Sequence, residues 1–141
     1  MEAISENFTY EEFEYSKKAE ENNIDNKIPD SDIKERIKEL VLNVLQPLRD
    51  AWGKPLPLNS GYRCPEVNKL VGGQPTSQHL KGEAADVRTD RPHELACLAR
   101  ELKLPFDQMI LYPDFVHFSH KLKELQRGYI GYSKTYKGGK L

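Results

Sequence analysis

The sequence predicts an α+β domain in which helices pack against a small, mostly antiparallel sheet. One long segment, residues 33–48, carries apolar side chains at the spacing of an amphipathic helix. Two short segments, residues 106–111 and 115–119, have the composition of strands and are joined by a turn. Several connections are too short for parallel crossovers, which favours antiparallel pairing. At 141 residues, we expect one domain spanning residues 1–141.

A first helix is predicted to begin near Tyr10. Thr9 followed by Glu12 forms a capping box, and Phe8 and Phe13 stand at the two positions of a hydrophobic staple. The helix is expected to run out in the polar residues 20–23, which lead into a loop.

The most secure element is the helix over residues 33–48. Its apolar stripe recurs at one face of a helix and consists of Ile33, Ile37, Leu40, Val41, Val44, Leu45 and Leu48. Pro47 falls inside this pattern and is expected to kink or end the helix, because proline has no N–H and its ring crowds the preceding turn.

Short strands and helices alternate in the rest of the chain. Strands are predicted at residues 55–60, 84–87, 106–111 and 115–119. The prolines in the first of these strands indicate an edge position in the sheet. One helix is expected to begin at Pro65 and stop at Gly72-Gly73, and another to span residues 92–103.

Composition excludes some functional classes. The 21 basic and 22 acidic residues nearly balance, so the charge gives no argument for binding nucleic acid or a membrane. The N-terminus does not resemble a secretory signal, and no stretch is apolar enough to be a transmembrane segment. We therefore expect a chain made as a soluble cytoplasmic protein, with two reduced cysteines and as a monomer.

Residues 77–86 contain the side chains around which we expect the site to form. His79 and Asp86 lie seven residues apart, and imidazole and carboxylate both suit zinc. Catalytic zinc sites commonly have three protein ligands and leave a fourth position for water, so a third ligand is required. The best candidate is His117.

The strand pattern around His117 separates it from the core. A period of two places His117 and Ser119 on one face, and Val116 and Phe118 on the other. His120 is expected to be solvated at the strand end rather than to bind metal. Asp114 precedes His117 by three residues, and the turn before it must aim its carboxylate if it is to serve as a base.

Two motifs together identify a family resemblance. Ser77-x-His79-x-x-Gly82-x-Ala84-x-Asp86 and Asp114-x-x-His117-x-Ser119 resemble the signature of the zinc D-Ala-D-Ala carboxypeptidase/L-alanyl-D-glutamate peptidase family. Further matches at residues 60–63, 67–68, 71–73 and 106–108 extend the resemblance over roughly residues 8–120. The resemblance implies the hedgehog/D-Ala-D-Ala-peptidase fold and cleavage of peptidoglycan stem peptides.

The resemblance also implies roles for individual residues. His79, Asp86 and His117 would bind Zn²⁺, and Asp114 would be the catalytic base that acts on the zinc-bound water. Arg63 would contact the substrate, either at the developing oxyanion or at a carboxylate. Ser77 and Ser119 either line the pocket or satisfy backbone groups. The family pattern has tryptophan where this chain has Phe115.

Several alternatives stay open at this stage. The bond cut would be L-Ala-D-Glu, slightly favoured, or D-Ala-D-Ala, and the enzyme would act on the bacterial cell wall, as phage lysins do. The competing interpretation is a non-catalytic module that binds wall peptide and carries a structural zinc. The basic tail, residues 121–141, would be a solvated final hairpin with a frayed end or would hold an anionic wall polymer.

Overall fold

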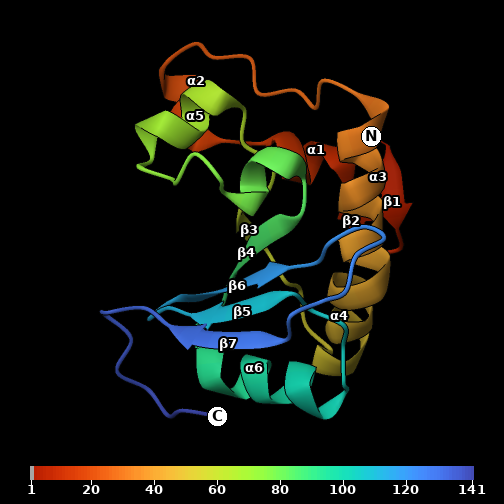
Figure 1. Cartoon of the computed structure of the whole chain (residues 1–141), viewed down its shortest axis with the longest axis vertical. Helices are drawn as coiled ribbons and strands as arrows, with labels where there is room; N and C mark the ends of the chain where they lie inside the picture. The colour runs from red at the N-terminus through yellow and green to blue at the C-terminus, as the bar shows by residue number, and fades with distance from the viewer. Residues whose placement is uncertain (1) are drawn as a thin grey trace.

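A five-stranded sheet organises the fold (Figure 1). In this computed structural model, which describes residues 2–141, the strand order is β3-β4-β6-β5-β7. The strands are β3 (Leu58–Ser60), β4 (Ala84–Arg88), β5 (Gln108–Leu111), β6 (Phe115–Ser119) and β7 (Tyr129–Tyr132). All neighbours are antiparallel except β5 and β7, which pair parallel. The predicted α+β class with a mostly antiparallel sheet is confirmed, and β3 lies at an edge.

The N-terminal region differs from the prediction in two places. A small sheet of β1 (Ala3–Ser5) and β2 (Phe8–Thr9) precedes the first helix and was not predicted. The predicted capping box is present, since the Glu12 N–H donates to the Thr9 hydroxyl (3.3 Å) and the Thr9 N–H donates to the Glu12 carboxylate (3.2 Å). The single helix predicted from Tyr10 is wrong.

Two short helices replace that single helix. They are α1 (Tyr10–Glu14) and α2 (Lys17–Glu21). The break between them has a local cause, because the Ser16 hydroxyl accepts a hydrogen bond from the Ala19 N–H (3.1 Å) and starts a new helix.

The long helix continues past Pro47. It comprises α3 (Ser31–Leu40), a π-helical turn η1 (Val41–Leu45) and α4 (Gln46–Trp52), and ends at Gly53 with a left-handed φ of 74°. The predicted disturbance therefore takes the form of a π turn that ends two residues before the proline. The helix does not end there.

The core lies between this long helix and one face of the sheet. The remaining helices are α5 (Pro65–Leu70), the 3₁₀ helix η2 (Gln78–Lys81) and α6 (Pro92–Glu101), and α6 contacts α4, β5 and β6. Fully buried apolar side chains come from both layers: Ile37, Leu40, Val44 and Leu48 from the helix, and Val87, Leu111, Val116 and Phe118 from the sheet. The opposite face of β6 is thus left for His117, as predicted.

The final hairpin predicted for residues 121–141 is wrong. Instead of folding back on itself, the segment crosses over and adds β7 beside β5, with Gln108 opposite Tyr129 and Leu111 opposite Tyr132. The chain end is held as well, because the Leu141 N–H donates to the Tyr132 hydroxyl (2.7 Å). Within residues 2–141, no helix combines the length and the apolar character needed to cross a membrane.

Gly82 allows the segment between η2 and β4 to pack closely against α3. It has a left-handed φ of 77°, and a Cβ there would lie 2.8 Å from the Ile33 carbonyl oxygen. Gly82→Ala is therefore expected to lower the free energy of unfolding by about 2–4 kcal/mol, through backbone strain plus overpacking. Chemical denaturation measures this. Gly53→Ala is the matched control, because Gly53 has a φ of 74° but open space around it; an equal loss in both variants would contradict the packing argument.

Candidate metal centre

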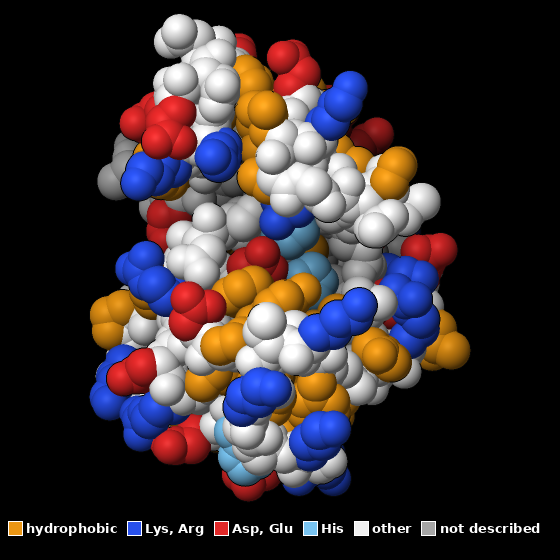
Figure 2. All heavy atoms as spheres, turned by 90° about the vertical axis from the view of Figure 1, so that its left-hand side faces the viewer, with side chains coloured by type: hydrophobic (Ala, Val, Ile, Leu, Met, Phe, Trp, Pro, Cys, Tyr) orange, Lys and Arg blue, Asp and Glu red, His pale blue; other side chains and the backbone are white. Residues whose placement is uncertain are grey.

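A cleft of about 710 Å³ is lined by ionisable side chains from several segments of the chain. Figure 2 shows this face, with histidine and acidic side chains at the bottom of a hollow. The cleft is lined by His79, Asp86, His117 and Arg63, by residues of the 72–81 segment, and by the loop after β6 that carries Lys121, Glu124 and Arg127. A polar cleft with several convergent ionisable groups is the expected form of a binding or catalytic site.

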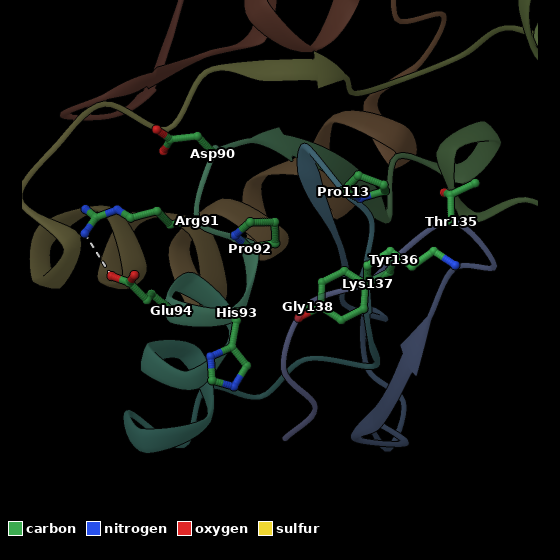
Figure 3. A pocket seen from close by; sticks show the side chains of 10 residues that line it. All are labelled: Asp90, Arg91, Pro92, His93, Glu94, Pro113, Thr135, Tyr136, Lys137 and Gly138. Carbon is green, nitrogen blue, oxygen red and sulfur yellow. Dashed lines mark hydrogen bonds and ion pairs between the residues drawn. The ribbon is translucent and has the colours of Figure 1, made fainter.

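A second, smaller pocket of about 370 Å³ lies between the start of α6 and residues 135–138 (Figure 3). Arg91 there pairs with Glu94 (2.8 Å), and His93 also lines the pocket. Among the residues that the structure describes, the group of possible metal ligands lies in the larger cleft and not here. The larger cleft is therefore the candidate site.

Three elements bring the predicted metal ligands together. His79 lies on η2, Asp86 at the centre of β4 and His117 on β6, and Asp86 stands directly opposite His117 in the antiparallel register. Directly paired residues project from the same face of a sheet, so this register alone places the carboxylate beside the imidazole.

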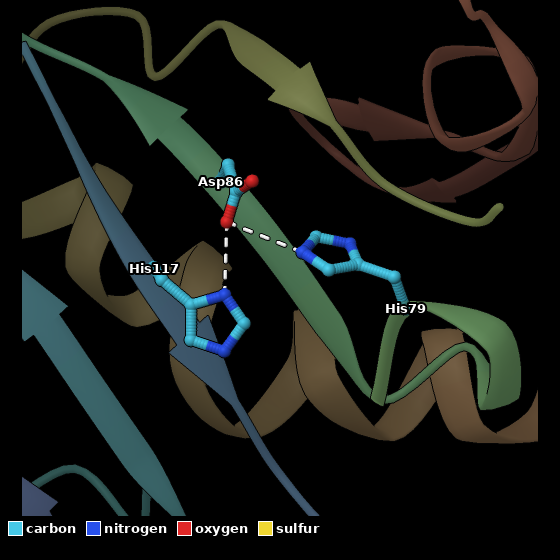
Figure 4. Close-up of side chains that lie close together, drawn as sticks. All are labelled: His79, Asp86 and His117. Atoms are coloured by element: carbon cyan, nitrogen blue, oxygen red, sulfur yellow. Dashed lines mark hydrogen bonds and ion pairs between the residues drawn. The ribbon is translucent and has the colours of Figure 1, made fainter. Parts of the chain in front are cut away.

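The three side chains converge on one point (Figure 4). Asp86 Oδ1 lies 2.9 Å from His117 Nδ1 and 3.3 Å from His79 Nε2, and one ligand atom from each residue lies within 4.8 Å of the others. His79 Nδ1 lies 2.7 Å from the Gly61 carbonyl oxygen. That carbonyl accepts a hydrogen bond from the Nδ1–H and leaves the Nε2 lone pair free, which is the tautomer that a metal-binding histidine needs.

The electrostatics of Asp86 fit a metal ligand. Burial by itself raises the pKa of its carboxyl, but the neighbouring His79 and His117 outweigh burial and hold the pKa of Asp86 well below its usual range. Asp86 is therefore an anion at neutral pH although it is only 7% exposed. A buried anion between two imidazoles matches the nitrogen and oxygen donor set of zinc sites.

Arg63 reaches the same carboxylate. Its Nη2 lies 3.5 Å from Asp86 Oδ2, its Nε donates to the Ser60 hydroxyl (3.0 Å) and its Nη1 to the Asn68 side-chain oxygen (3.3 Å). Burial lowers the pKa of the Arg63 guanidinium, while Asp86 opposes that shift. Gly73 leaves room for this arrangement, because a Cβ there would lie 2.1 Å from the Asn68 side-chain oxygen.

The two predicted serines differ in placement. Ser77 lines the cleft, and its hydroxyl also accepts from the His79 N–H (3.2 Å), so it caps the 3₁₀ helix that carries the ligand. The buried Ser119 hydroxyl accepts from the Gln108 N–H (3.0 Å) and is not in the cleft lining. His120, expected to be solvated, is instead 9% exposed, with Nδ1 2.7 Å from the Pro105 carbonyl oxygen.

Asp114 is not brought into the cluster. It lies exposed in the turn between β5 and β6, where its carbonyl oxygen accepts from the Thr89 N–H (3.0 Å), and it is absent from the cleft lining. Phe115, beside it, stacks on the ring of Tyr112 at 4.1 Å between centroids. Tyr112 does line the cleft, so the same turn contributes one wall of the site.

An ion pair between Asp107 and the cleft residue Arg127 was not predicted from the sequence. Asp107 is fully buried and accepts from Arg127 Nη2 (2.7 Å), from the Arg127 backbone N–H (2.9 Å) and from Gln78 Nε2 (3.0 Å). Arg127 lies 20 residues away in the chain, so no local pattern links the two. The only available signal was the match of residues 106–108 to the family pattern.

This ion pair predicts a pH dependence of stability. Burial raises the pKa of Asp107, but hydrogen bonds from Arg127 and Gln78 outweigh burial and lower the pKa from the ordinary 3.8 to about 2. The stabilisation is therefore complete above roughly pH 4 and is lost as the pH falls to about 2. Because Arg127 is half exposed, we expect a loss on the order of 1 kcal/mol over that window. Asp107→Asn should show a correspondingly flatter profile by chemical denaturation; identical profiles would contradict this.

The comparison with protein families gives a match. The family model described as Peptidase M15 matches residues 6–120, which is most of the chain and includes the whole cluster of His79, Asp86 and His117. Among curated proteins, none matches the chain.

Proposed function

The chain belongs to the peptidase M15 family of metallopeptidases, and from this premise we propose that it is a zinc-dependent hydrolase of peptide bonds in peptidoglycan stem peptides. The observation that supports the proposal most directly is the group of His79, Asp86 and His117 in a polar cleft, with their ligand atoms within 4.8 Å of one another. Two imidazoles and one carboxylate are a donor set that zinc takes in hydrolases.

His79, Asp86 and His117 would hold the metal, and the surrounding residues suit that role. The Gly61 carbonyl orients the His79 ring, and Ser77 caps the short helix that carries it. When bound, Zn²⁺ supplies Lewis-acid polarisation of a carbonyl and lowers the pKa of water to about 7.

The chain's own charged groups then act on the substrate. Arg63, fixed by Ser60 and Asn68, would stabilise negative charge on the carbonyl oxygen under attack or pair with a substrate carboxylate. Asp114 would accept a proton from the attacking water at its carboxylate and deliver it to the departing amine as the C–N bond breaks. The turn that carries Asp114 also carries the cleft residue Tyr112, and Asp114 must turn inward from its exposed position to perform this step.

Among the bonds of a stem peptide we favour L-Ala-D-Glu over D-Ala-D-Ala, with the bacterial cell wall as the place of action and a monomer as the active form.

One observation favours a second candidate from a different functional class. Asp114 lies outside the cleft lining, as expected for a non-catalytic module that binds wall peptide and carries a structural zinc, because such a module needs no base at the metal.

Mass spectrometry of peptidoglycan fragments separates the two functions. Fragments incubated with the zinc-loaded protein are expected to show new termini that identify the bond, and the same protein treated with a chelator should leave them intact. If one zinc binds per chain and fragments from several wall chemotypes stay uncut, the peptidase proposal is wrong and the binding module takes its place.

A further inference from the structure

Basic side chains predominate among the charged groups of the large cleft that reach solvent (Figure 2). Arg63 and Asp86 pair with each other, and Glu83 is only 6% exposed. Among the other lining residues that the structure describes, one partly or fully exposed side chain is acidic, Glu124, and three are basic: Lys81, Lys121 and Arg127. A concave surface with an excess of positive charge attracts anions.

Lys121 presents an unpaired ammonium group from an ordered loop. It forms no ion pair with any residue that the structure describes, although Glu124 lies three residues further along the chain. Its backbone is fixed by Gln126, which accepts from the Lys121 N–H (2.8 Å) and donates to the Lys121 carbonyl (2.6 Å) and the Glu124 carbonyl (3.0 Å). Because the loop is already ordered, binding an anion costs little backbone entropy.

Arg127 adds hydrogen-bond donors beside this charge. Its Nε and Nη2 donate to Asp107 Oδ1 (3.0 Å) and Oδ2 (2.7 Å), whereas Nη1 has no hydrogen-bond partner within residues 2–141. The side chain remains 52% exposed and lines the cleft. Asp107 therefore fixes the guanidinium without covering it. Arg63 differs, because each of its three side-chain nitrogens has a protein partner.

The two basic residues lie together, within reach of the metal centre. Gln126, which is bonded to the backbone of Lys121, directly precedes Arg127, and Asp107 donates its N–H to the last carbonyl of β6 (2.7 Å). His117 precedes Lys121 by four residues, so their Cα atoms are at most about 14 Å apart. An extended peptide advances about 3.3 Å per residue, so a peptide held at the metal spans this distance with about four residues.

We propose that Lys121 and Arg127 form an anion subsite that binds a carboxylate of the stem peptide, within about four residues of the bond that is cut. This assignment rests on the proposed peptidase function. A carboxylate is the anion that such a peptide carries, at D-Glu or at a free C-terminus. An ammonium group and a guanidinium side by side offer it charge and N–H donors together.

Calorimetric titration of the zinc-loaded protein tests the assignment. The probes are a synthetic stem tetrapeptide and analogues in which one carboxylate at a time is a carboxamide, with mass spectrometry showing whether a probe is cut. Lys121→Gln should bind the tetrapeptide roughly five- to tenfold more weakly. One carboxamide analogue should lose a similar factor with the parent protein and nothing further with Lys121→Gln, which identifies the carboxylate.

Two further variants of the same loop sharpen the test. Lys121→Glu should reverse the preference and bind that carboxamide analogue more tightly than the acid, because like charges repel. Lys123→Gln is the matched control, since Lys123 is an exposed lysine of the same loop that does not line the cleft, and it should bind like the parent. Arg127 is left unchanged, because its removal would leave the buried Asp107 without a counter-charge.

The possible outcomes are distinguishable. Equal affinity of the parent and Lys121→Gln, or an equal loss in Lys123→Gln, would show that the subsite does not exist, while cleavage of the tetrapeptide would leave the peptidase proposal standing. If the parent neither binds nor cuts any probe, the proposed function fails and the subsite fails with it. Thermal unfolding and metal stoichiometry check that Lys121→Gln is folded, and if it is not, the uncharged Lys121→Met replaces it with the same expectation.

Discussion

Asp86→Asn is expected to lower zinc affinity by at least about 100-fold. Removing a residue that only orients a metal ligand can already cost about 100-fold in affinity, and Asp86 would be a ligand itself. The variant loses the anionic member of the ligand set and also leaves Arg63, 3.5 Å away, without its counter-charge. Peptidase activity should fall with the bound metal. The measurement is metal competition against a chromophoric chelator, with peptide cleavage followed in parallel.

Asp90→Asn is the matched control for this variant. Asp90 is an exposed carboxylate of the smaller pocket, so its loss should leave zinc affinity unchanged. Chelator-treated parent protein should reproduce the inactivity of Asp86→Asn. Zinc bound to Asp86→Asn with parental affinity would exclude the three-residue site and require ligands from elsewhere in the chain.

Asp114→Asn is expected to lower kcat by about 10²–10⁴-fold, the usual contribution of a positioned general acid or base. Asp114 is exposed and outside the group of possible metal ligands, so zinc stoichiometry and stability should remain those of the parent. A fall in kcat without loss of metal would show that the turn before β6 moves its carboxylate to the reacting peptide.

Glu124→Gln is the informative comparison, because Glu124 is a carboxylate that lines the cleft in this structure. It should retain activity if Asp114 is the base. The reverse result, an active Asp114→Asn and an inactive Glu124→Gln, would transfer the role to the loop after β6. Full activity of both variants would leave general-base catalysis by these two residues without support.

Features set by neighbouring residues could be predicted from the sequence. The capping box of Thr9 and Glu12 acts across three residues, and it is present as predicted. The alternation in β6 placed Val116 and Phe118 in the core and His117 on the other face, as the structure has it. The ligand types followed from chemistry, since imidazole and carboxylate at these positions already suit zinc.

Local patterns also failed where two local signals competed. The helix predicted from Tyr10 was interrupted because the Ser16 hydroxyl caps a second helix. At Pro47 the chain kept its helical course through a π turn, because the apolar stripe on both sides of the proline packs into one core. In both places the local signal, a capping serine or a proline, did act on the helix. Whether the helix broke or continued depended on the side chains packed around it.

By itself, the sequence determined which residues can form each helix and strand and which side chains can bind a metal, because those properties depend on neighbours in the chain. Only the tertiary structure decided how they meet: His117 reaches Asp86 across 31 residues, the Gly61 carbonyl selects the tautomer of His79 across 18, and Arg127 pairs with Asp107 across 20. The same is true of the parallel pairing of β7. Such contacts depend on strand register and on the packing of distant segments, and no spacing in the sequence encodes them.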